Sequence, residues 1–288
     1  MMEKAVLKTL IYADIFDYPL RVYEIHKWLI GRKTTLRQVE KALERLRVKD
    51  KAEKVKDYYF LSGRRKLVRK RQQKEKQSGK FLWKAKMIVL LLKMIPFIKL
   101  VGISGGLAME NAGKGDDIDL FIVMSKNRLW ISRLLTLGIL TLIGQRRKVN
   151  QSGSKTAGKI CANMLLEEDK LAQQKKDIYL AHEVLQMKVL WQRDGIYSKY
   201  LLDNEWVFKF LPNWVGEQQV ISKTQNLRIR KSYLDYFDNL AKWLQLKIMQ
   251  QPKGMERIED GALYFHPKDS RIRVLSKYKQ RVNKLTLS

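Results

Sequence analysis

The stretch Gly102-Ile103-Ser104-Gly105-Gly106, followed ten residues later by Asp117-Ile118-Asp119-Leu120, decides the fold of the central part of this 288-residue chain. The first segment predicts a strand, a tight glycine turn and a short helix, and the second predicts a strand that carries two carboxylates. Strand side chains alternate with a period of two, so both carboxylates of Asp-x-Asp lie on one face. Two carboxylates placed so close repel each other unless a cation sits between them.

The residues around this pair of strands predict a metal and phosphate site. Hard carboxylate oxygens suit Mg²⁺, which usually keeps waters and substrate phosphates as further ligands. Gly105 and Gly106 let backbone N–H groups approach an anion, and the following helix presents its positive N-terminal end. Such a site is equipped for phosphoryl or nucleotidyl transfer. The alternative is a Gly-rich loop before an ordinary strand, but Asp116, Asp117 and Asp119 crowd much like charge together for a structural loop.

A glycine pair, about ten further residues and then Asp-apolar-Asp-apolar resembles the signature of the DNA polymerase beta-type nucleotidyltransferase superfamily. The match is tight over residues 95–125 and looser over 95–190. The resemblance implies that Asp117 and Asp119 are catalytic ligands of Mg²⁺ or Mn²⁺. It also implies that Ser104, Gly105 and Gly106 bind the phosphates of a nucleoside triphosphate (NTP). The implied reaction places a nucleoside monophosphate on a hydroxyl acceptor.

A third carboxylate is where the chain departs from this pattern, because the superfamily normally supplies one from a later strand. The strand expected over residues 160–166 offers Asn163 there, and a neutral amide cannot act as a base. Glu183, on a helix expected over 171–190, is the other weak candidate for this third position. Either the acid comes from elsewhere, or a single metal suffices, or the site binds nucleotide without turnover.

Residues 1–63 resemble a winged helix-turn-helix domain. Apolar spacing predicts three helices, and two strand-like pieces follow at 52–55 and 58–61. The basic residues on or beside the third helix suit the phosphate contacts of a recognition helix. They are Arg32, Lys33, Arg37, Lys41, Arg45 and Arg47. The other interpretation is a small helical adaptor that packs on the enzyme domain.

Residues 64–94 predict a basic helical linker. Arg64, Arg65, Lys66, Arg69, Lys70 and Arg71 begin it, and Glu75 is the single acid of residues 64–80. Blocks of like charge usually mark an exposed face, so we expect this stretch to be solvated. It either contacts nucleic acid or simply joins two domains.

The net charge of +29 indicates a polyanionic partner, most simply RNA or DNA. A generally basic proteome and an anionic membrane surface are the alternatives. A single cysteine, Cys161, excludes an intrachain disulfide and a Cys-rich zinc site, so a reducing cytoplasm is expected. Residues 129–144 are the longest apolar stretch, and they fall short of the ~20 residues that span a bilayer. We therefore expect no stable membrane insertion.

The sequence as a whole predicts an α+β protein, with a nucleotidyltransferase-like mixed sheet, flanking helices, an N-terminal winged-helix domain and a C-terminal helical lobe. Trp206, Phe210, Trp214, Tyr233, Phe237 and Trp243 are expected to build the core of that lobe. The expected divisions are 1–63, 64–94, 95–190 and 191–288. The first functional hypothesis is a Mg²⁺-dependent nucleotidyltransferase. The second is a winged-helix nucleic-acid binder whose nucleotidyltransferase domain senses nucleotide or is degenerate.

Overall fold

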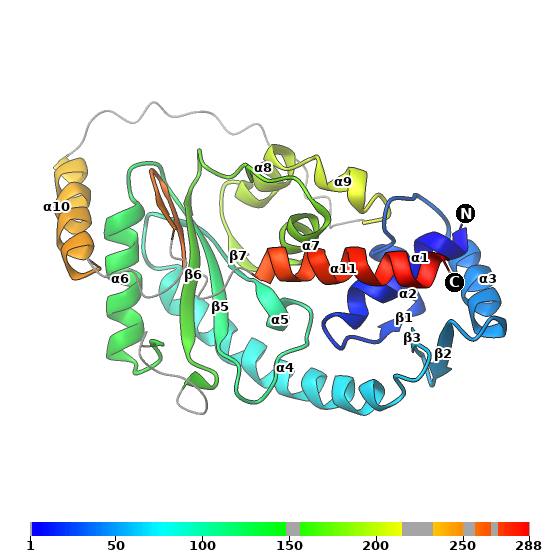
Figure 1. Ribbon diagram of the computed structural model, residues 1–288. Helices are drawn as coiled ribbons and strands as arrows, with labels where there is room; N and C mark the ends of the chain where they lie inside the picture. The colour runs from blue at the N-terminus through cyan, green and yellow to red at the C-terminus, as the bar shows by residue number, and fades with distance from the viewer. Residues whose placement is uncertain (1, 148–155, 215–232, 250–256, 266–269, 288) are drawn as a thin grey trace.

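The computed structural model describes residues 2–147, 156–214, 233–249, 257–265 and 270–287 (Figure 1). It is a mixed α+β structure, in which a small N-terminal sheet lies apart from a larger mixed sheet. The expected α+β class is therefore confirmed. Among the helices of the described residues, none is both long enough and apolar enough to cross a bilayer.

The N-terminal part of the chain forms three helices and an antiparallel sheet of order β1-β3-β2. Its elements are α1 (Met2–Asp14), β1 (Leu20–Arg21), α2 (Val22–Lys27), α3 (Leu36–Val48), β2 (Ala52–Val55) and β3 (Tyr58–Leu61). The start of α3 follows from its sequence, because Thr35 and Gln38 form a reciprocal capping box. Val39, Leu43 and Leu46 of α3 then point into the core at helical spacing. The three helices and two strands expected here are confirmed.

The larger sheet has the order β7-β4-β5-β6-β9-β8, and β5 and β6 are its parallel pair. β4 runs antiparallel to both β5 and β7, and β9 runs antiparallel to β6 and to β8. The strands are β4 (Ile98–Ile103), β5 (Ile118–Met124), β6 (Ile160–Glu167), β7 (Lys188–Gln192), β8 (Arg257–Glu259) and β9 (Ala262–Tyr264). The helices that accompany them are α4 (Lys66–Leu92), α5 (Gly105–Ala108), α6 (Leu129–Leu142), α7 (Ile178–Gln186), α8 (Ile196–Asp203), α9 (Val207–Phe210), α10 (Tyr233–Ile248) and α11 (Ser270–Leu287).

Alternate residues of β5 belong to two different cores. Leu120 and Ile122 pack in a core that includes α4 and α6. Phe121 and Val123 pack in the other, which includes α7 and is continuous with the core of the N-terminal unit. Because side chains alternate along a strand, Asp119 lies on the same face as Phe121. The Asp119 side chain is thus on the face of the sheet that packs against α7 and the N-terminal unit.

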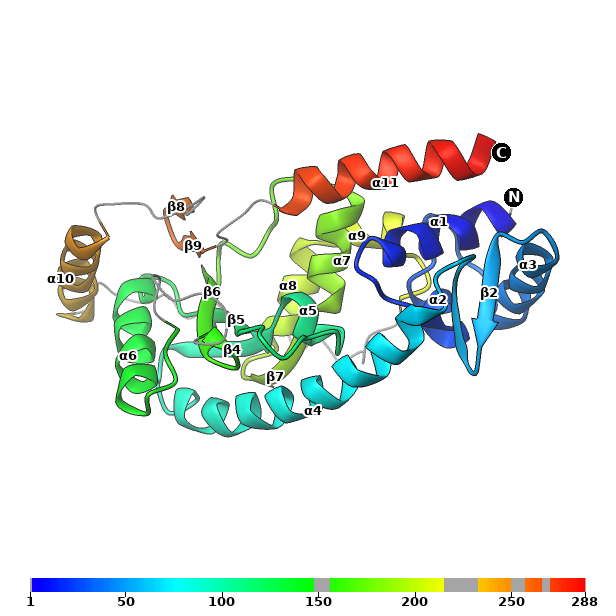
Figure 2. The ribbon, with the colours of Figure 1, turned by 60° about the horizontal axis from the view of Figure 1, so that its bottom comes forward.

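Two long helices, α4 and α11, run from the larger sheet to the N-terminal unit, as two views show (Figures 1 and 2). Along α11, Arg271 pairs with Asp177 and Arg281 pairs with Asp14 of α1. The segment that follows α9 contributes as well, since Asn213 Nδ2 donates to the carbonyl of His26 in α2 over 3.0 Å. The N-terminal unit is therefore packed against the rest of the chain along several contacts.

The helix expected over 171–190 is shorter than its apolar spacing predicts. α7 ends at Gln186, because Met187 adopts an extended backbone (φ −54°, ψ 123°). The β-branched and aromatic residues Val189 and Trp191 then pair with β4 as the edge strand β7. Apolar spacing alone did not distinguish the last turn of a buried helix from the start of this strand.

The aromatic residues of α10 do not form a core, contrary to expectation. Tyr233, Phe237 and Trp243 are 92%, 53% and 58% exposed, whereas Trp206 is buried. α10 instead turns a polar stripe toward α6: Asp238 accepts the N–H of Ile131 over 2.9 Å, and Gln245 donates to the carbonyl of Trp130 over 2.8 Å. Asp238 satisfies a free N–H group in the first turn of α6, which favours this polar face of α10 at the contact and leaves the aromatic residues outward.

Candidate active site

The glycine turn after β4 lies directly against a carboxylate of β5. Ser104 N donates to the carbonyl of Asp119 over 3.0 Å, which fixes the turn on the neighbouring strand. Gly105 has a φ of +65°, and a Cβ there would lie 3.3 Å from Asp119 Oδ2. The backbone conformation therefore favours glycine, and any side chain here would crowd the Asp119 carboxylate. The expected strand, turn, short helix and second strand are all present, as β4, α5 and β5.

Asp117 and Asp119 stand together at the start of β5, with Asp117 one residue before the strand begins. One carboxylate oxygen of each, and Cys161 Sγ, lie within 4.8 Å of one another. Burial, followed by the charge of Asp117, raises the pKa of Asp119 to about 7. Two hard carboxylate ligands in a half-buried position fit a divalent cation, which would restore the charged form of Asp119.

Arg147 already places a positive charge on this group. Its Nη1 lies 2.6 Å from Asp117 Oδ2 and 3.8 Å from Cys161 Sγ. The position of Arg147 is fixed by its backbone, because Arg147 N donates to the carbonyl of Ile160 in β6 over 2.9 Å. In the structure, a guanidinium thus neutralises the Asp117 carboxylate, and both acids are half-buried.

The strand β6 brings Cys161, rather than Asn163, beside the carboxylates. Cys161 is the Cα partner of Asp119 in the parallel ladder. Asn163 falls in a bulge between the pairs Leu120–Ala162 and Phe121–Met164, and its carbonyl accepts the N–H of Phe265 over 2.8 Å. The sequence alone did not indicate Cys161 as a ligand, because the register between β5 and β6 cannot be read from either strand by itself. Burial and the nearby Asp119 raise the pKa of its thiol to about 12.

Glu183, the other candidate for the third position, lies on α7 outside the group of three ligands, among the residues that the structure describes. Burial raises its pKa to about 7, and a hydrogen bond from Tyr179 opposes that shift. Its charge also raises the pKa of Asp119. Glu183 is therefore close enough to act on Asp119 electrostatically, although it is not placed as a direct ligand beside Asp117.

Two cavities meet at Tyr179 and Glu183. The smaller has a volume of about 180 Å³ and is lined by Ser104 and Phe121. The larger has a volume of about 300 Å³ and lies between the glycine turn and the N-terminal unit. Gly105, Gly106, Tyr12, Phe16, Trp28 and His182 are among the residues that line the larger one. Gly105, which lines the larger cavity, also borders Asp119, so this cavity reaches the glycine turn beside that carboxylate.

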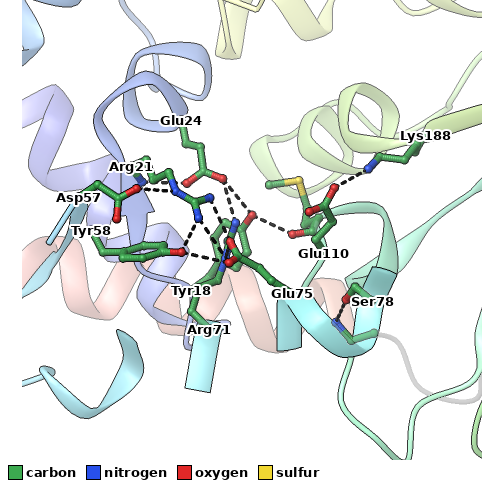
Figure 3. A network of polar contacts seen from close by, with 12 residues as sticks. Tyr18, Arg21, Glu24, Asp57, Tyr58, Arg71, Glu75, Ser78, Glu110 and Lys188 are labelled. Carbon is green, nitrogen blue, oxygen red and sulfur yellow. Dashed lines mark hydrogen bonds and ion pairs between the residues drawn. The ribbon is translucent and has the colours of Figure 1, made fainter. Parts of the chain in front are cut away.

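A buried polar network holds the N-terminal unit next to these cavities (Figure 3). Arg71 of α4 is 2% exposed, binds Glu24 and Glu75 over 3.0 and 2.8 Å, and stacks on the Tyr18 ring at 3.6 Å. Tyr18 in turn donates to the carbonyl of Met109, just after α5, over 2.8 Å. The expectation of a wholly solvated basic helix is thus wrong at Arg71, whose guanidinium links α2, α4 and the site.

The basic residues of α3 and the segment before it lie at the surface, as a recognition helix would require. Arg32, Lys33, Arg37, Lys41, Arg45 and Arg47 are all exposed. Two of them have acidic partners, since Arg45 lies 3.7 Å from Glu3 and Arg47 lies 2.7 Å from Glu44. Exposed pairs of this kind are weak and exchange readily with phosphates.

Comparison with known proteins identified no relative of this chain. A scan against protein-family models found no match, and a search of curated proteins found no similar sequence. The functional assignment therefore depends on the geometry of the site.

Proposed function

We propose that this protein is a divalent-cation-dependent nucleotidyltransferase, which transfers a nucleoside monophosphate from an NTP to a hydroxyl acceptor. The observation that carries the proposal is the contact between the glycine turn and Asp119, where a Cβ on Gly105 would lie 3.3 Å from Oδ2. A phosphate bound by the turn would be adjacent to a cation bound by Asp117 and Asp119. The cation would stabilise the charge of an in-line displacement and lower the pKa of the attacking hydroxyl.

The arrangement of the strands supports the proposed family. β4 and β5 are antiparallel and joined by the glycine turn and α5, and β5 and β6 are parallel and joined by α6. This is the strand-helix-strand order that the sequence resemblance implies. The order α1-β1-α2-α3-β2-β3, with β1 beside β3, likewise supports a winged helix.

Cations at the rim of the cavities support an anionic ligand. Lys175, Arg257 and Arg271 line the smaller cavity, and Arg273 lines the larger. Together with the net charge of +29, these residues favour a triphosphate and an acceptor on nucleic acid. In the reaction, Asp117 and Asp119 would hold Mg²⁺ or Mn²⁺. Gly105 and Gly106 would hold the leaving pyrophosphate through backbone N–H groups, and Ser104 would hold it through its unpartnered hydroxyl.

The proposal is tested by incubating the purified protein with each α-labelled nucleoside triphosphate, Mg²⁺ or Mn²⁺, and total RNA. We expect label on RNA with one nucleotide, and none with Asp117→Asn or Asp119→Asn. Asp116→Asn is the matched control, because Asp116 is exposed on the same loop and accepts a hydrogen bond from Gly113 N over 2.8 Å. Transfer that survives Asp119→Asn, or no transfer with any nucleotide, would contradict the proposal.

A second candidate function is a nucleic-acid-binding protein with an inactive nucleotidyltransferase domain. The ion pair between Arg147 and Asp117 favours it, because a guanidinium then supplies the charge that a metal would supply. The exposed basic face of α3 would make the phosphate contacts. Arg37→Gln with Lys41→Gln should then weaken RNA binding and lower its salt dependence. Asp119→Asn should leave RNA binding unchanged in such a binding protein. In an active enzyme, the same substitution would also abolish nucleotide transfer.

A further inference from the structure

The three ligand atoms at the start of β5 are chemically unequal, because two are carboxylate oxygens and the third is sulfur. Asp117, Asp119 and Cys161 each contribute one atom to a group spanning at most 4.8 Å. Ligands at about 2.0–2.3 Å from one tetrahedral ion lie about 3.3–3.8 Å apart. The three atoms can therefore bind a single cation if the side chains move together by roughly half an ångström to one ångström.

Two further observations indicate that a ligand belongs at this position. Ser104 is 8% exposed and lines the smaller cavity, and its Oγ is buried without a hydrogen-bond partner. Its backbone N–H donates to the backbone carbonyl of Asp119, so Ser104 is held directly beside the residue that carries one of the two carboxylates. The Arg147 guanidinium also lies across Asp117 and Cys161, where a positive charge is evidently accommodated.

We propose that Cys161 supplies a thiolate ligand to the cation held by Asp117 and Asp119, which makes the site prefer Zn²⁺ or Co²⁺ to Mg²⁺. This inference rests on the proposed function, because it assumes that the carboxylate pair binds a metal. Thiolate ligands select softer divalent ions, whereas all-oxygen sites suit Mg²⁺. A cation that takes Asp117 and Cys161 as ligands also displaces Arg147 from both of them.

Cobalt binding tests the inference directly, because Cys161 is the single cysteine of the chain. Any thiolate-to-cobalt charge-transfer band in the near ultraviolet must therefore come from Cys161. We expect the band to saturate at one equivalent of Co²⁺ in the full-length protein, kept reduced, and to vanish on adding Zn²⁺ but not excess Mg²⁺. Cys161→Ser should lack the band and bind Co²⁺ at least about ten-fold more weakly.

Matched variants separate failure of this inference from failure of the proposed function. Mn²⁺ binding, followed by electron paramagnetic resonance, reports on the carboxylates whether or not sulfur takes part. Asp119→Asn should lose both signals, and Asp116→Asn should keep both. If Mn²⁺ binds in an Asp119-dependent manner but no cobalt band forms, the thiolate ligand is refuted and the metal site stands. If neither metal binds, both proposals are wrong.

Discussion

Replacing Arg71 by Met tests whether the buried network fixes the N-terminal unit. Arg71 is 2% exposed and is paired with Glu24 and Glu75 over 3.0 and 2.8 Å. Methionine keeps much of the length of the side chain and its contact with the Tyr18 ring, but it removes the charge. The variant therefore leaves Glu24 without its cation and leaves Glu75 with Arg21 alone.

The expected loss of stability depends on the partners that Glu24 and Glu75 retain in the variant. Breaking a buried ion pair by removing one partner typically costs about 3–5 kcal/mol. Here Arg21 still binds Glu75 over 3.0 Å, and Arg21 N still donates to Glu24 over 2.7 Å. We therefore expect about 2–3 kcal/mol. Unfolding entropy is about 2.1 cal/mol/K per residue, which gives about 0.6 kcal/mol/K here and a fall in Tm of about 3–5 °C.

The assay is urea and thermal unfolding of Arg71→Met beside Arg69→Met. Arg69 is exposed two residues away on α4 and should change stability by less than about 0.5 kcal/mol. Adding Glu24→Gln to Arg71→Met removes the orphaned charge and should recover part of the loss. The reasoning is refuted if Arg71→Met is as stable as the original protein, or if Arg69→Met loses as much.

Two further predictions concern the cavity next to the N-terminal unit. Burial lowers the pKa of His182 to about 4, below its ordinary 6.5, so the unfolded chain binds more protons between these values. The stability from neutral His182 is present above pH 6.5 and is lost as the pH falls toward 4, by about 2 kcal/mol at about pH 5. In the His182→Phe variant, this difference in unfolding free energy between about pH 7 and about pH 5 should disappear from the unfolding curves. Gly105→Ala should lower the unfolding free energy by about 1–2 kcal/mol, because its φ is +65°, and should also abolish nucleotide transfer. Gly144 has a φ of +63° and open space around it, so Gly144→Ala should lose similar stability and keep transfer. Equal activity of the two alanine variants would disprove the contact with Asp119.

The sequence was most informative where one segment specifies its own structure. The capping box at Thr35, the strand pair at 52–55 and 58–61, and the glycine turn before α5 all involve neighbours in the chain. The two carboxylates were also found from sequence, because alternation along a strand places them on one face whatever the partner strand is.

Features that depend on how separate segments meet could not be predicted in the same way. Cys161 is brought to Asp119 by strand register, and Arg147 reaches Asp117 from the segment after α6. Arg71 carried a usable signal, since Glu75 lies four residues later as the single acid of the basic block. That spacing predicts a helical ion pair, but burial of the pair depends on Glu24 from another helix.

The charge balance of the site predicts that Arg147 competes with the metal: its guanidinium supplies positive charge when no metal is bound and must be displaced for a metal to bind. A cation bound by Asp117 must displace a guanidinium held at 2.6 Å. Arg147→Gln should therefore tighten Mn²⁺ binding, by about five-fold if the pair contributes about 1 kcal/mol at this partly exposed position. Arg146→Gln is the matched control, because Arg146 precedes it but is bound to Thr141 over 3.5 Å, away from the carboxylates. Titration by electron paramagnetic resonance measures both. If Arg147→Gln weakens Mn²⁺ binding instead, the guanidinium supports the metal-bound state, and competition between the two cations is refuted.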